Sequence, residues 1–183
     1  SPDRGKPVSH FAEQVTGFVA VAPPIEGRGR YAPGNPSPSV ACHIAHVRVD
    51  PDTGEVETLG YVVVQDVGRA LNPALVRGQL QGGAVQSIGW ALYEELQHDE
   101  GGQLLSGSFM QYAVPRAHRL PDIEVDYIEI PSAVGPFGAK GIAEAAVMAG
   151  TGAMANAVAD AIGGRVSDLP MTPPRVWRAA SRA

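Results

Sequence analysis

The sequence predicts an α+β fold in which pairs of strands pack with a long central helix and with a second helix of small residues. Three observations predict this fold. Two β-rich segments flank a turn at residues 50–54, an apolar stripe at i+4 spacing runs from residue 76 to residue 92, and a Gly- and Ala-rich segment ends at Gly163-Gly164. The chain has 183 residues, of which 44% are hydrophobic, so it can form one domain with a packed core.

Residues 1–38 are expected to form an extended, Pro- and Gly-rich connecting arm, and residues 39–183 are expected to form the folded subdomain. The arm shows little hydrophobic periodicity and has one apolar run, at residues 19–22. A long irregular segment is unusual inside an isolated compact domain. We therefore expect the arm to lie on a partner or on another part of the same polypeptide.

The first regular element is predicted to be a β-hairpin. Residues 43–49 alternate weakly between apolar and polar, residues 56–64 are rich in β-formers, and Asp50-Pro51-Asp52-Thr53-Gly54 between them is typical of a turn. His43 and His46 are three positions apart on the first strand, which places their side chains on opposite faces. A metal site shared by these two histidines is therefore not expected.

A long helix is predicted to follow the hairpin, from about residue 73 to residue 96. Asn72 is a favourable N-cap, and Pro73 suits the first helical position, where a backbone N–H has no partner within the helix. One face of the helix is aliphatic and can cover a sheet; its residues are Val76, Leu80, Ala84, Ile88 and Leu92.

The rest of the chain is predicted to contain two strands and two further helices. The strands are expected near residues 104–112 and 123–130, followed by a Gly- and Pro-rich loop over residues 131–141. A small-residue helix is expected from residue 151 or 152 to residue 162, ended by Gly163-Gly164 because glycine readily adopts left-handed geometry. A short final helix is expected to begin after Thr172, where two prolines follow.

Composition argues against several classes of protein. The net charge is −5 and Lys and Arg are not clustered, so nucleic acid is not an expected partner. No apolar stretch is expected to cross a membrane, and no signal-peptide pattern opens the chain. Cys42 is the only cysteine, so the chain cannot form an internal disulfide or supply the four ligands of an iron–sulfur cluster. These features favour a cytoplasmic location.

The predicted long helix contains four glycines, each of which costs about 1 kcal/mol relative to alanine. At 100° per residue, Gln79, Gly83 and Gln86 lie on one face, opposite the aliphatic stripe. One interpretation is a face that binds a flat polar ligand, because glycine gives access and glutamine offers a donor and an acceptor. The other interpretation is that the glycines permit close helix packing and the glutamines face water.

Glu144 is the only charged residue between Gly141 and Ala159. If it is buried among these small residues, its proton affinity rises and it can act as a general base near neutral pH, with Lys140 as a modulating partner. The alternative is a carboxylate that begins a helical turn and complements the helix dipole.

Several segments resemble the molybdenum hydroxylase family, which comprises xanthine dehydrogenases, aldehyde oxidases and carbon monoxide dehydrogenases. The resemblance is carried by DPDTGEV, QDVGRALNP, GQLQGG, GAKGIAE and LPMTPPRVW, which occur here in the family's order. It covers roughly residues 39–177 and concerns the C-terminal portion of the large, molybdopterin-binding subunit. Because that subunit is several times longer, the resemblance implies that this chain is part of a larger molybdopterin-binding domain.

The resemblance also implies roles for individual residues. The acidic residue of the family's AKG-x-x-E segment is the base beside molybdenum and matches Glu144. The glutamine that contacts the molybdopterin cofactor in the family matches Gln79. Gly83, Lys140 and Gly141 are assigned to the same cofactor site, and no residue of this chain is assigned as a ligand of the metal.

The function implied by the resemblance is part of a molybdenum-dependent oxidoreductase that hydroxylates an aldehyde or an N-heterocycle with water as the oxygen source. The molybdenum–molybdopterin cofactor is expected to be shared with the remainder of the large subunit, and [2Fe–2S] clusters and FAD are expected on partner domains or subunits. The chain is then either a fragment or a separately encoded subunit. A non-catalytic assembly or scaffold protein that retains the fold is the alternative.

Overall fold

The computed structural model describes residues 27–32, 34–35 and 37–182. Residues from Gly34 onward form one compact unit. Most of the predicted connecting arm lies outside the residues that the structure describes. Ser37 is described, and its Oγ donates a hydrogen bond to Ser132 Oγ at 2.5 Å. The compact unit thus begins before residue 39.

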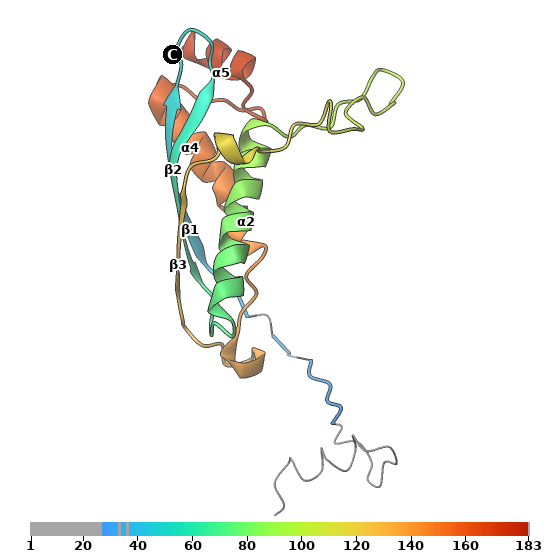
Figure 1. Cartoon of the computed structure of the whole chain (residues 1–183), viewed down its shortest axis with the longest axis vertical. Coiled ribbons are helices and arrows are strands. Elements are labelled where there is room, and N and C mark those ends of the chain that lie inside the picture. The colour runs from blue at the N-terminus through green and yellow to red at the C-terminus, as the bar shows by residue number, and fades with distance from the viewer. Residues whose placement is uncertain (1–26, 33, 36, 183) are drawn as a thin grey trace, which may run out of the picture. The chain divides into compact units, whose positions relative to one another are not determined.

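A three-stranded sheet forms one layer of the compact unit (Figure 1). β1 (Ala41–Val49) pairs antiparallel with β2 (Val56–Asp66), and the predicted turn at residues 50–54 joins them. β3 (Ile123–Ile128) pairs in parallel with β2, which gives the strand order β1-β2-β3. The predicted hairpin and the predicted strand after residue 123 are confirmed.

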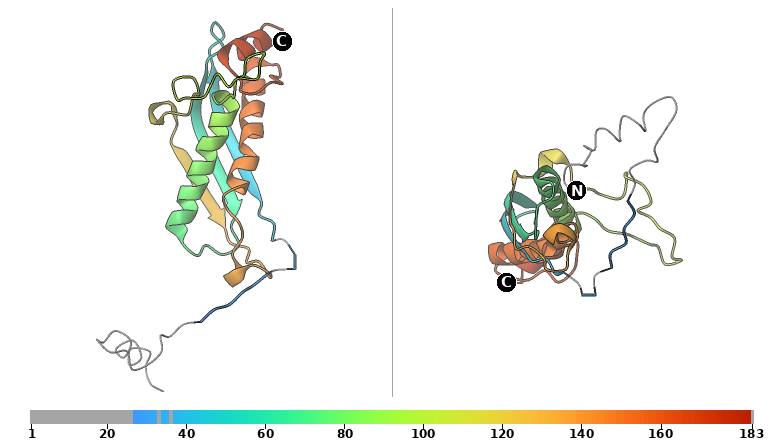
Figure 2. Two further views of the ribbon diagram at one scale, coloured as in Figure 1. Left: turned by 90° about the vertical axis from the view of Figure 1, so that its right-hand side faces the viewer. Right: turned by 90° about the horizontal axis from the view of Figure 1, so that it is seen from below.

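Helix α2 (Pro73–Leu92) lies over β2 and β3 and forms most of the second layer (Figures 1 and 2). Its predicted N-cap is confirmed, because Asn72 Oδ1 accepts a hydrogen bond from the backbone N–H of Leu75 at 3.1 Å. All five residues of the predicted aliphatic stripe are buried. The helix ends at Leu92, four residues earlier than predicted, because the backbone of Tyr93 leaves the helical region with φ −128° and ψ −45°.

Three further helices complete the unit: α3 (Ala145–Met148), α4 (Gly150–Ile162) and α5 (Pro173–Ala180). α4 is the predicted small-residue helix; it lies over β1 and beside α2 (Figure 2). It ends at Gly163, whose φ of 71° confirms the predicted left-handed cap. The predicted final helix is also confirmed. Two short 3₁₀ helices are η2 (Ala117–Arg119) and η3 (Pro136–Gly138).

The strand predicted near residues 104–112 is wrong. This segment forms turns and irregular chain, and its only strand-like feature among the described residues is an isolated bridge between His98 and Leu104. It projects from the body of the compact unit (Figure 1), and Phe109 and Met110 are 82% and 89% exposed. Because the segment lies away from the sheet, its backbone N–H and C=O groups have no neighbouring strand to pair with. Apolar side chains alone do not replace these backbone hydrogen bonds.

The expectation that no stretch is apolar enough to cross a membrane is also wrong when length and composition alone are considered. Within the described residues, one helical stretch, Ala145–Ile162, meets that criterion with a mean hydropathy of 1.3. The stretch spans α3 and α4, and its buried residues, including Ala146, Met154 and Val158, belong to the core shared with α2 and the sheet. Only 22% of this stretch is buried, so packing inside the described domain covers part of it.

Close packing of α2 against α3 explains one of the four helical glycines. A Cβ added to Gly83 would lie 2.6 Å from the Cβ of Ala146 and 2.7 Å from its carbonyl oxygen. A Cβ added to Gly78 or Gly82 would meet no atom within 4 Å. The packing interpretation is therefore confirmed for Gly83, whereas Gly78 and Gly82 leave an open surface on α2.

This difference predicts opposite effects of two neighbouring substitutions. Gly83→Ala should lower the free energy of unfolding by about 1 kcal/mol or more, because the new methyl group overlaps backbone atoms of Ala146 that cannot move freely. Gly82→Ala should raise it by about 1 kcal/mol, since alanine favours the helix and the added methyl group has space. Urea unfolding followed by circular dichroism measures both. Stabilisation by Gly83→Ala would contradict the described packing.

Candidate functional site

Glu144 immediately precedes α3, at the end of the loop that follows β3. Its backbone is helical, with φ −72° and ψ −38°, and its carbonyl oxygen accepts hydrogen bonds from Val147 at 2.9 Å and Met148 at 3.1 Å. The side chain is exposed and makes no capping hydrogen bond. The structure therefore supports the interpretation of Glu144 as the residue that begins a helical turn, and this chain alone does not bury its carboxylate.

A hollow of about 380 Å³ lies beside Glu144. Its lining comes from the end of the arm and from the segment around Glu144, and comprises Ser37, Ser39, Gly141, Ile142, Ala143, Glu144, Ala145 and Met148. Glu144 is the only charged residue in this lining. The carboxylate therefore faces a space whose other walls are small, apolar or hydroxyl-bearing.

Gln79 does not line this hollow, but it belongs to a neighbouring surface. Gln79 and Gln86 are exposed on α2, and Trp90 on the same face is 45% exposed. Gln79 lies one helical turn before Gly83, and Gly83 touches Ala146, two residues after Glu144. The structure therefore brings the helix that carries Gln79 into contact with the segment that carries Glu144.

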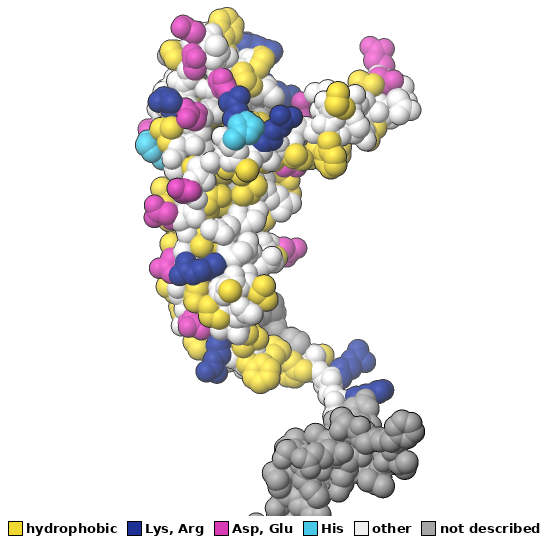
Figure 3. All heavy atoms as spheres, viewed as in Figure 1, with side chains coloured by type: hydrophobic (Ala, Val, Ile, Leu, Met, Phe, Trp, Pro, Cys, Tyr) yellow, Lys and Arg dark blue, Asp and Glu magenta, His cyan; other side chains and the backbone are white. Residues whose placement is uncertain are grey.

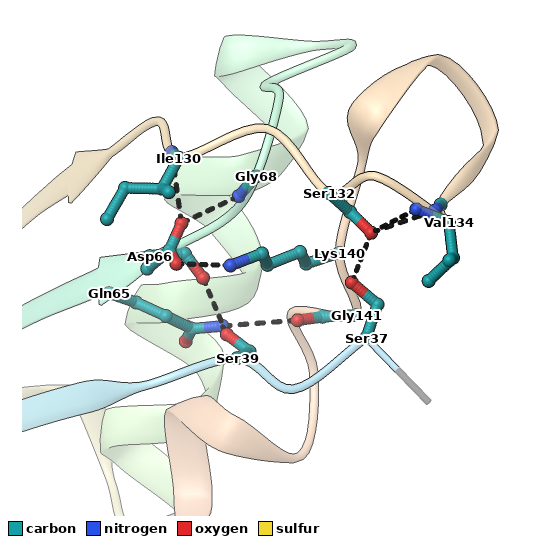
Figure 4. Close-up of polar contacts among 11 residues, drawn as sticks. Ser37, Ser39, Gln65, Asp66, Gly68, Ile130, Ser132, Val134, Lys140 and Gly141 are labelled. Atoms are coloured by element: carbon teal, nitrogen blue, oxygen red, sulfur yellow. Dashed lines mark hydrogen bonds and ion pairs between the residues drawn. The ribbon is translucent and has the colours of Figure 1, made fainter. Parts of the chain in front are cut away.

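Lys140 lies in the loop before Glu144, and its ammonium group is not directed to Glu144. Lys140 Nζ donates to Asp66 Oδ2 at 2.6 Å, and the two side chains are only 12% and 7% exposed (Figure 4). The expectation that Lys140 modulates Glu144 as a direct partner is therefore wrong. Its partner is the carboxylate at the end of β2, 74 residues away in the sequence.

Asp66 forms further hydrogen bonds at the junction of the sheet and the loop. Its Oδ1 accepts from the backbone N–H groups of Gly68 at 2.9 Å and Ile130 at 3.2 Å. Burial acts to raise the pKa of Asp66, but the Lys140 ammonium and these two N–H groups outweigh burial and hold the pKa below its ordinary value. Asp66 is therefore a buried, ionised carboxylate.

Gly68 permits the close approach of the two segments that Asp66 joins. Its φ is +69°, and an added Cβ would lie 2.3 Å from the carbonyl oxygen of Gly138 and 2.9 Å from the backbone nitrogen of Lys140. The backbone N–H of Lys140 also donates to the carbonyl oxygen of Val67 at 3.1 Å. Only glycine satisfies both the left-handed backbone and the lack of space at this position.

Gln65 connects β2 to the residues that directly precede Glu144. Its Nε2 lies 3.4 Å from the carbonyl oxygen of Gly141 and 3.0 Å from Ser39 Oγ (Figure 4). It also lies 3.2 Å from the carbonyl oxygen of Ile142. Gln65 is 1% exposed, and its Oε1 has no hydrogen-bond partner among the described residues. The side-chain amide nitrogen of Gln65 therefore holds the loop by donating hydrogen bonds to it.

A second polar group lies below α3, on the buried side of β1 and β2. His43 Nδ1 and Tyr61 Oη are 3.0 Å apart, and Ser87 Oγ lies 3.1 Å from the carbonyl oxygen of Val147. Burial raises the pKa of Tyr61 to about 12, against a smaller opposing effect of Ser87, and burial lowers the pKa of His43. Both groups are thus neutral near pH 7. His46 is exposed on the opposite face of β1, which confirms the predicted separation of the two histidines.

Sequence reasoning missed Gln65, Ser39 and the role of Asp66. No spacing in the sequence relates these residues to the loop before Glu144. The available signal was a polar pair, Gln65-Asp66, directly after the apolar run of a central strand, together with a lone lysine in a Gly-rich loop. A buried acid at the end of a strand requires a partner, and Lys140, which the sequence analysis assigned to Glu144 and the cofactor site, is that partner.

The surface beside Glu144 fits a large polar cofactor. A Cβ added to Gly82 or to Gly141 would meet no atom within 4 Å, so both the helix face and the loop are open to a ligand. Next to these open backbones, the Gln79 amide offers a donor and an acceptor, and Glu144 offers a proton acceptor. Amide and backbone groups of this kind suit the fused, hydrogen-bonding rings of a pterin.

Comparison with known proteins identifies the family. A family model described as a molybdopterin cofactor-binding domain matches residues 3–121. The chain is 40% identical over 137 residues to the gamma subunit of the 6-hydroxypseudooxynicotine dehydrogenase complex of Paenarthrobacter nicotinovorans, covering 73% of this chain and 17% of that protein. It is 32% identical over 156 residues to the carbon monoxide dehydrogenase large chain of Afipia carboxidovorans, covering 85% of this chain and 19% of that protein.

Solved structures agree with this result. The Cu,Mo-CO dehydrogenase matches with a TM-score of 0.77 and 31% identity over 83% of this chain and 20% of that chain. Quinoline 2-oxidoreductase from Pseudomonas putida 86 matches with a TM-score of 0.72 and 35% identity over 76% and 18% of the two chains. The chain belongs to the molybdenum hydroxylase family, as its motifs predict, and it spans about a fifth of the length of these relatives.

The buried pair predicts a measurable pH dependence of stability. Asp66→Asn should lower the free energy of unfolding at pH 7 by about 3 kcal/mol, because it leaves the Lys140 ammonium buried without a counter-charge. Since the folded-state pKa of Asp66 is depressed, the wild-type chain keeps this contribution above the unfolded-state pKa of about 4 and loses it as the pH falls through the folded-state value. Urea unfolding at a series of pH values measures both effects.

Asp122→Asn is the matched control for this measurement. Asp122 is exposed just before β3, and its replacement should change the free energy of unfolding by no more than about 0.5 kcal/mol. If Asp66→Asn behaves like Asp122→Asn and keeps the wild-type pH dependence, the ion pair does not stabilise the fold.

Proposed function

We propose that the chain forms one wall of the molybdopterin site in a molybdenum-dependent hydroxylase that oxidises an aldehyde or an N-heterocycle with water as the oxygen source. The observation that supports this proposal is the placement of Glu144: an exposed carboxylate at a hollow, on a turn held by the contact of α3 with α2, the helix that also bears Gln79. The relatives named above include a 6-hydroxypseudooxynicotine dehydrogenase, a quinoline 2-oxidoreductase and carbon monoxide dehydrogenases, which supports this reaction class.

The remainder of the site is proposed to come from the rest of a large subunit, whether in the same polypeptide or in a separate one. Exposed apolar side chains gather on several parts of the surface, and Figure 3 shows them between interspersed acidic and basic groups on one face. Leu75 and Met148, near Gln79 and Glu144 in the sequence, are 67% and 80% exposed. Apolar exposure of this kind is typical of surfaces that another protein segment covers.

Electron transfer is proposed to use [2Fe–2S] clusters and FAD on partner domains or subunits. Cys42, the single cysteine, is exposed and cannot hold a cluster alone. We place the assembled enzyme in the cytoplasm, where such a thiol stays reduced. The substrate is a small molecule, and neither nucleic acid nor a membrane is proposed as a partner.

The cofactor is proposed to contact the Gln79 amide and the open backbone at Gly141. Gly83 contributes by admitting Ala146, which holds the turn of Glu144 beside α2, and Lys140 contributes by anchoring the loop to Asp66. When bound, the molybdenum cofactor supplies the oxygen that adds to the substrate carbon and accepts two electrons. Glu144 would serve as the general base that accepts a proton in this chemistry.

Replacing Glu144 with Gln tests the proposed base. In the assembled enzyme, Glu144→Gln should lower kcat by about 10²- to 10⁴-fold, because the amide cannot accept the proton, while the molybdenum content stays at the wild-type level. Glu124→Gln, at an exposed position of β3, is the matched control and should leave kcat unchanged. Wild-type turnover by Glu144→Gln would remove Glu144 from this role and favour a scaffold function for the chain.

A second substitution tests the proposed cofactor contact. Gln79→Ala should weaken retention of the pterin by about fivefold, which corresponds to the loss of one hydrogen bond worth about 1 kcal/mol. Gln81→Ala removes the same side chain from another exposed position of α2 and should retain the cofactor as the wild type does. Cofactor content after dilution or dialysis measures both variants, and equal losses would contradict a specific role of Gln79.

A further inference from the structure

We propose that Asp66, Lys140 and Gln65 are positioning residues that fix the place of the Glu144 carboxylate relative to the cofactor. This inference rests on the proposed function, because it concerns the residue that takes up the proton there. The three residues do not touch the hollow beside Glu144; they act on the backbone that leads to it (Figure 4).

The first connection is the buried ion pair between β2 and the loop. Lys140 is four residues before Glu144, and its ammonium group is held by Asp66 at 2.6 Å with little exposure of either side chain. Asp66 is itself fixed by the backbone of Gly68 and Ile130, so its carboxylate has a defined direction. The start of the segment that carries Glu144 is therefore tied to the sheet and not to solvent.

The second connection reaches closer to Glu144. Gln65 Nε2 lies 3.2 Å from the carbonyl oxygen of Ile142, and the same oxygen accepts the backbone N–H of Ala146 at 3.3 Å. The carbonyl that begins the turn containing Glu144 is thus held directly by β2. The donors of Gln65 are buried, so no water takes their place while the clamp is closed.

A third contact holds the other side of Glu144. Ala146 is fully buried against Gly83, and Ser87 Oγ reaches the carbonyl oxygen of Val147 at 3.1 Å. Glu144 is exposed between two fixed points, Ile142 and Ala146, and its own side chain makes no hydrogen bond that the described residues show. The backbone anchors, and not contacts of the carboxylate, therefore determine where this carboxylate lies.

A base needs such control because proton transfer depends steeply on distance. A misplacement of about 1 Å caused by a remote substitution can lower the rate by about 10²-fold. Loss of the Lys140 or Gln65 connection frees the segment before Glu144 on one side and leaves the Ala146 contact in place. The expected result is a carboxylate that is present near the cofactor but poorly directed.

The test compares turnover per bound molybdenum in the assembled enzyme. Lys140→Met should lower kcat per molybdenum by about 10-fold or more and change KM little, because the substrate does not contact Lys140. Gln65→Leu removes the second connection without leaving a charge unpaired, and it should have the same effect if Lys140→Met folds poorly. Loss of molybdenum with unchanged turnover per remaining molybdenum overturns the inference, since it assigns these residues to folding or cofactor retention.

Arg175→Met is the matched control. Arg175 Nη2 pairs with Glu95 at 2.8 Å, and this ion pair joins α5 to the segment after the C-terminal end of α2, whereas Asp66 precedes its N-terminal end. The control removes the cation of another partly buried ion pair and should leave kcat per molybdenum unchanged. An equal fall in Arg175→Met and Lys140→Met overturns the inference, because the effect is then a general one.

A double-mutant cycle separates this inference from the proposed function. If Lys140 acts through Glu144, Lys140→Met in the Glu144→Gln background should cause no further loss of kcat per molybdenum. The same loss in both backgrounds overturns the positioning role. Wild-type turnover by Glu144→Gln contradicts the proposed function itself, whereas an inactive Glu144→Gln together with a fully active Lys140→Met contradicts only the positioning role.

Discussion

The contact between Gly83 and Ala146 is the constraint on which the site depends. α2 packs on the sheet through an aliphatic stripe, and α3 meets α2 at Gly83, where the helix has no side chain to separate them. Ala146 is fully buried at that point. Because Ala146 is held there, the turn that begins at Glu144 has a fixed position along the axis of α2. This position is about one helical turn from Gln79.

The parallel arrangement of β2 and β3 explains why the polar anchors meet on the other side of Glu144. Parallel strands end at the same edge of a sheet, so the segment after Asp66 and the loop after Ile128 leave the sheet side by side. Asp66 accepts a hydrogen bond from Ile130, and Gly68 admits the loop at Gly138. A carboxylate at the end of β2 thereby orders a loop that is distant in the sequence.

Local signals in the sequence predicted most of the regular structure. The Asn72-Pro73 start of α2, the turn at residues 50–54 and the glycine end of α4 each depend on a few neighbouring residues, and the structure confirms them. The strand predicted at residues 104–112 failed because apolar, β-forming residues do not make a strand without a neighbour to pair with. The parallel register of β3 on β2 is likewise a long-range property that no local pattern contains.

The candidate site was predictable to a similar extent. The isolation of Glu144 and the small residues around Gly83 were visible in the sequence, and both lie where α2 and α3 meet. The exposure of Glu144 was not predictable, because burial depends on which other segments cover the loop. The Asp66–Lys140 pair was not predictable either, since 74 residues separate its members and only the fold brings them together.

The sheet itself has a consequence for how this polypeptide is handled in the laboratory and in the cell. In the described part of the chain, β1 and β3 each pair with a neighbour on one side only, so their other sides present unpaired backbone N–H and C=O groups. Sheet edges of this kind can pair with an additional strand. That strand comes either from a partner segment or from other copies of the chain in an aggregate. The two borders of the sheet are therefore where this fold is most open to pairing with another strand.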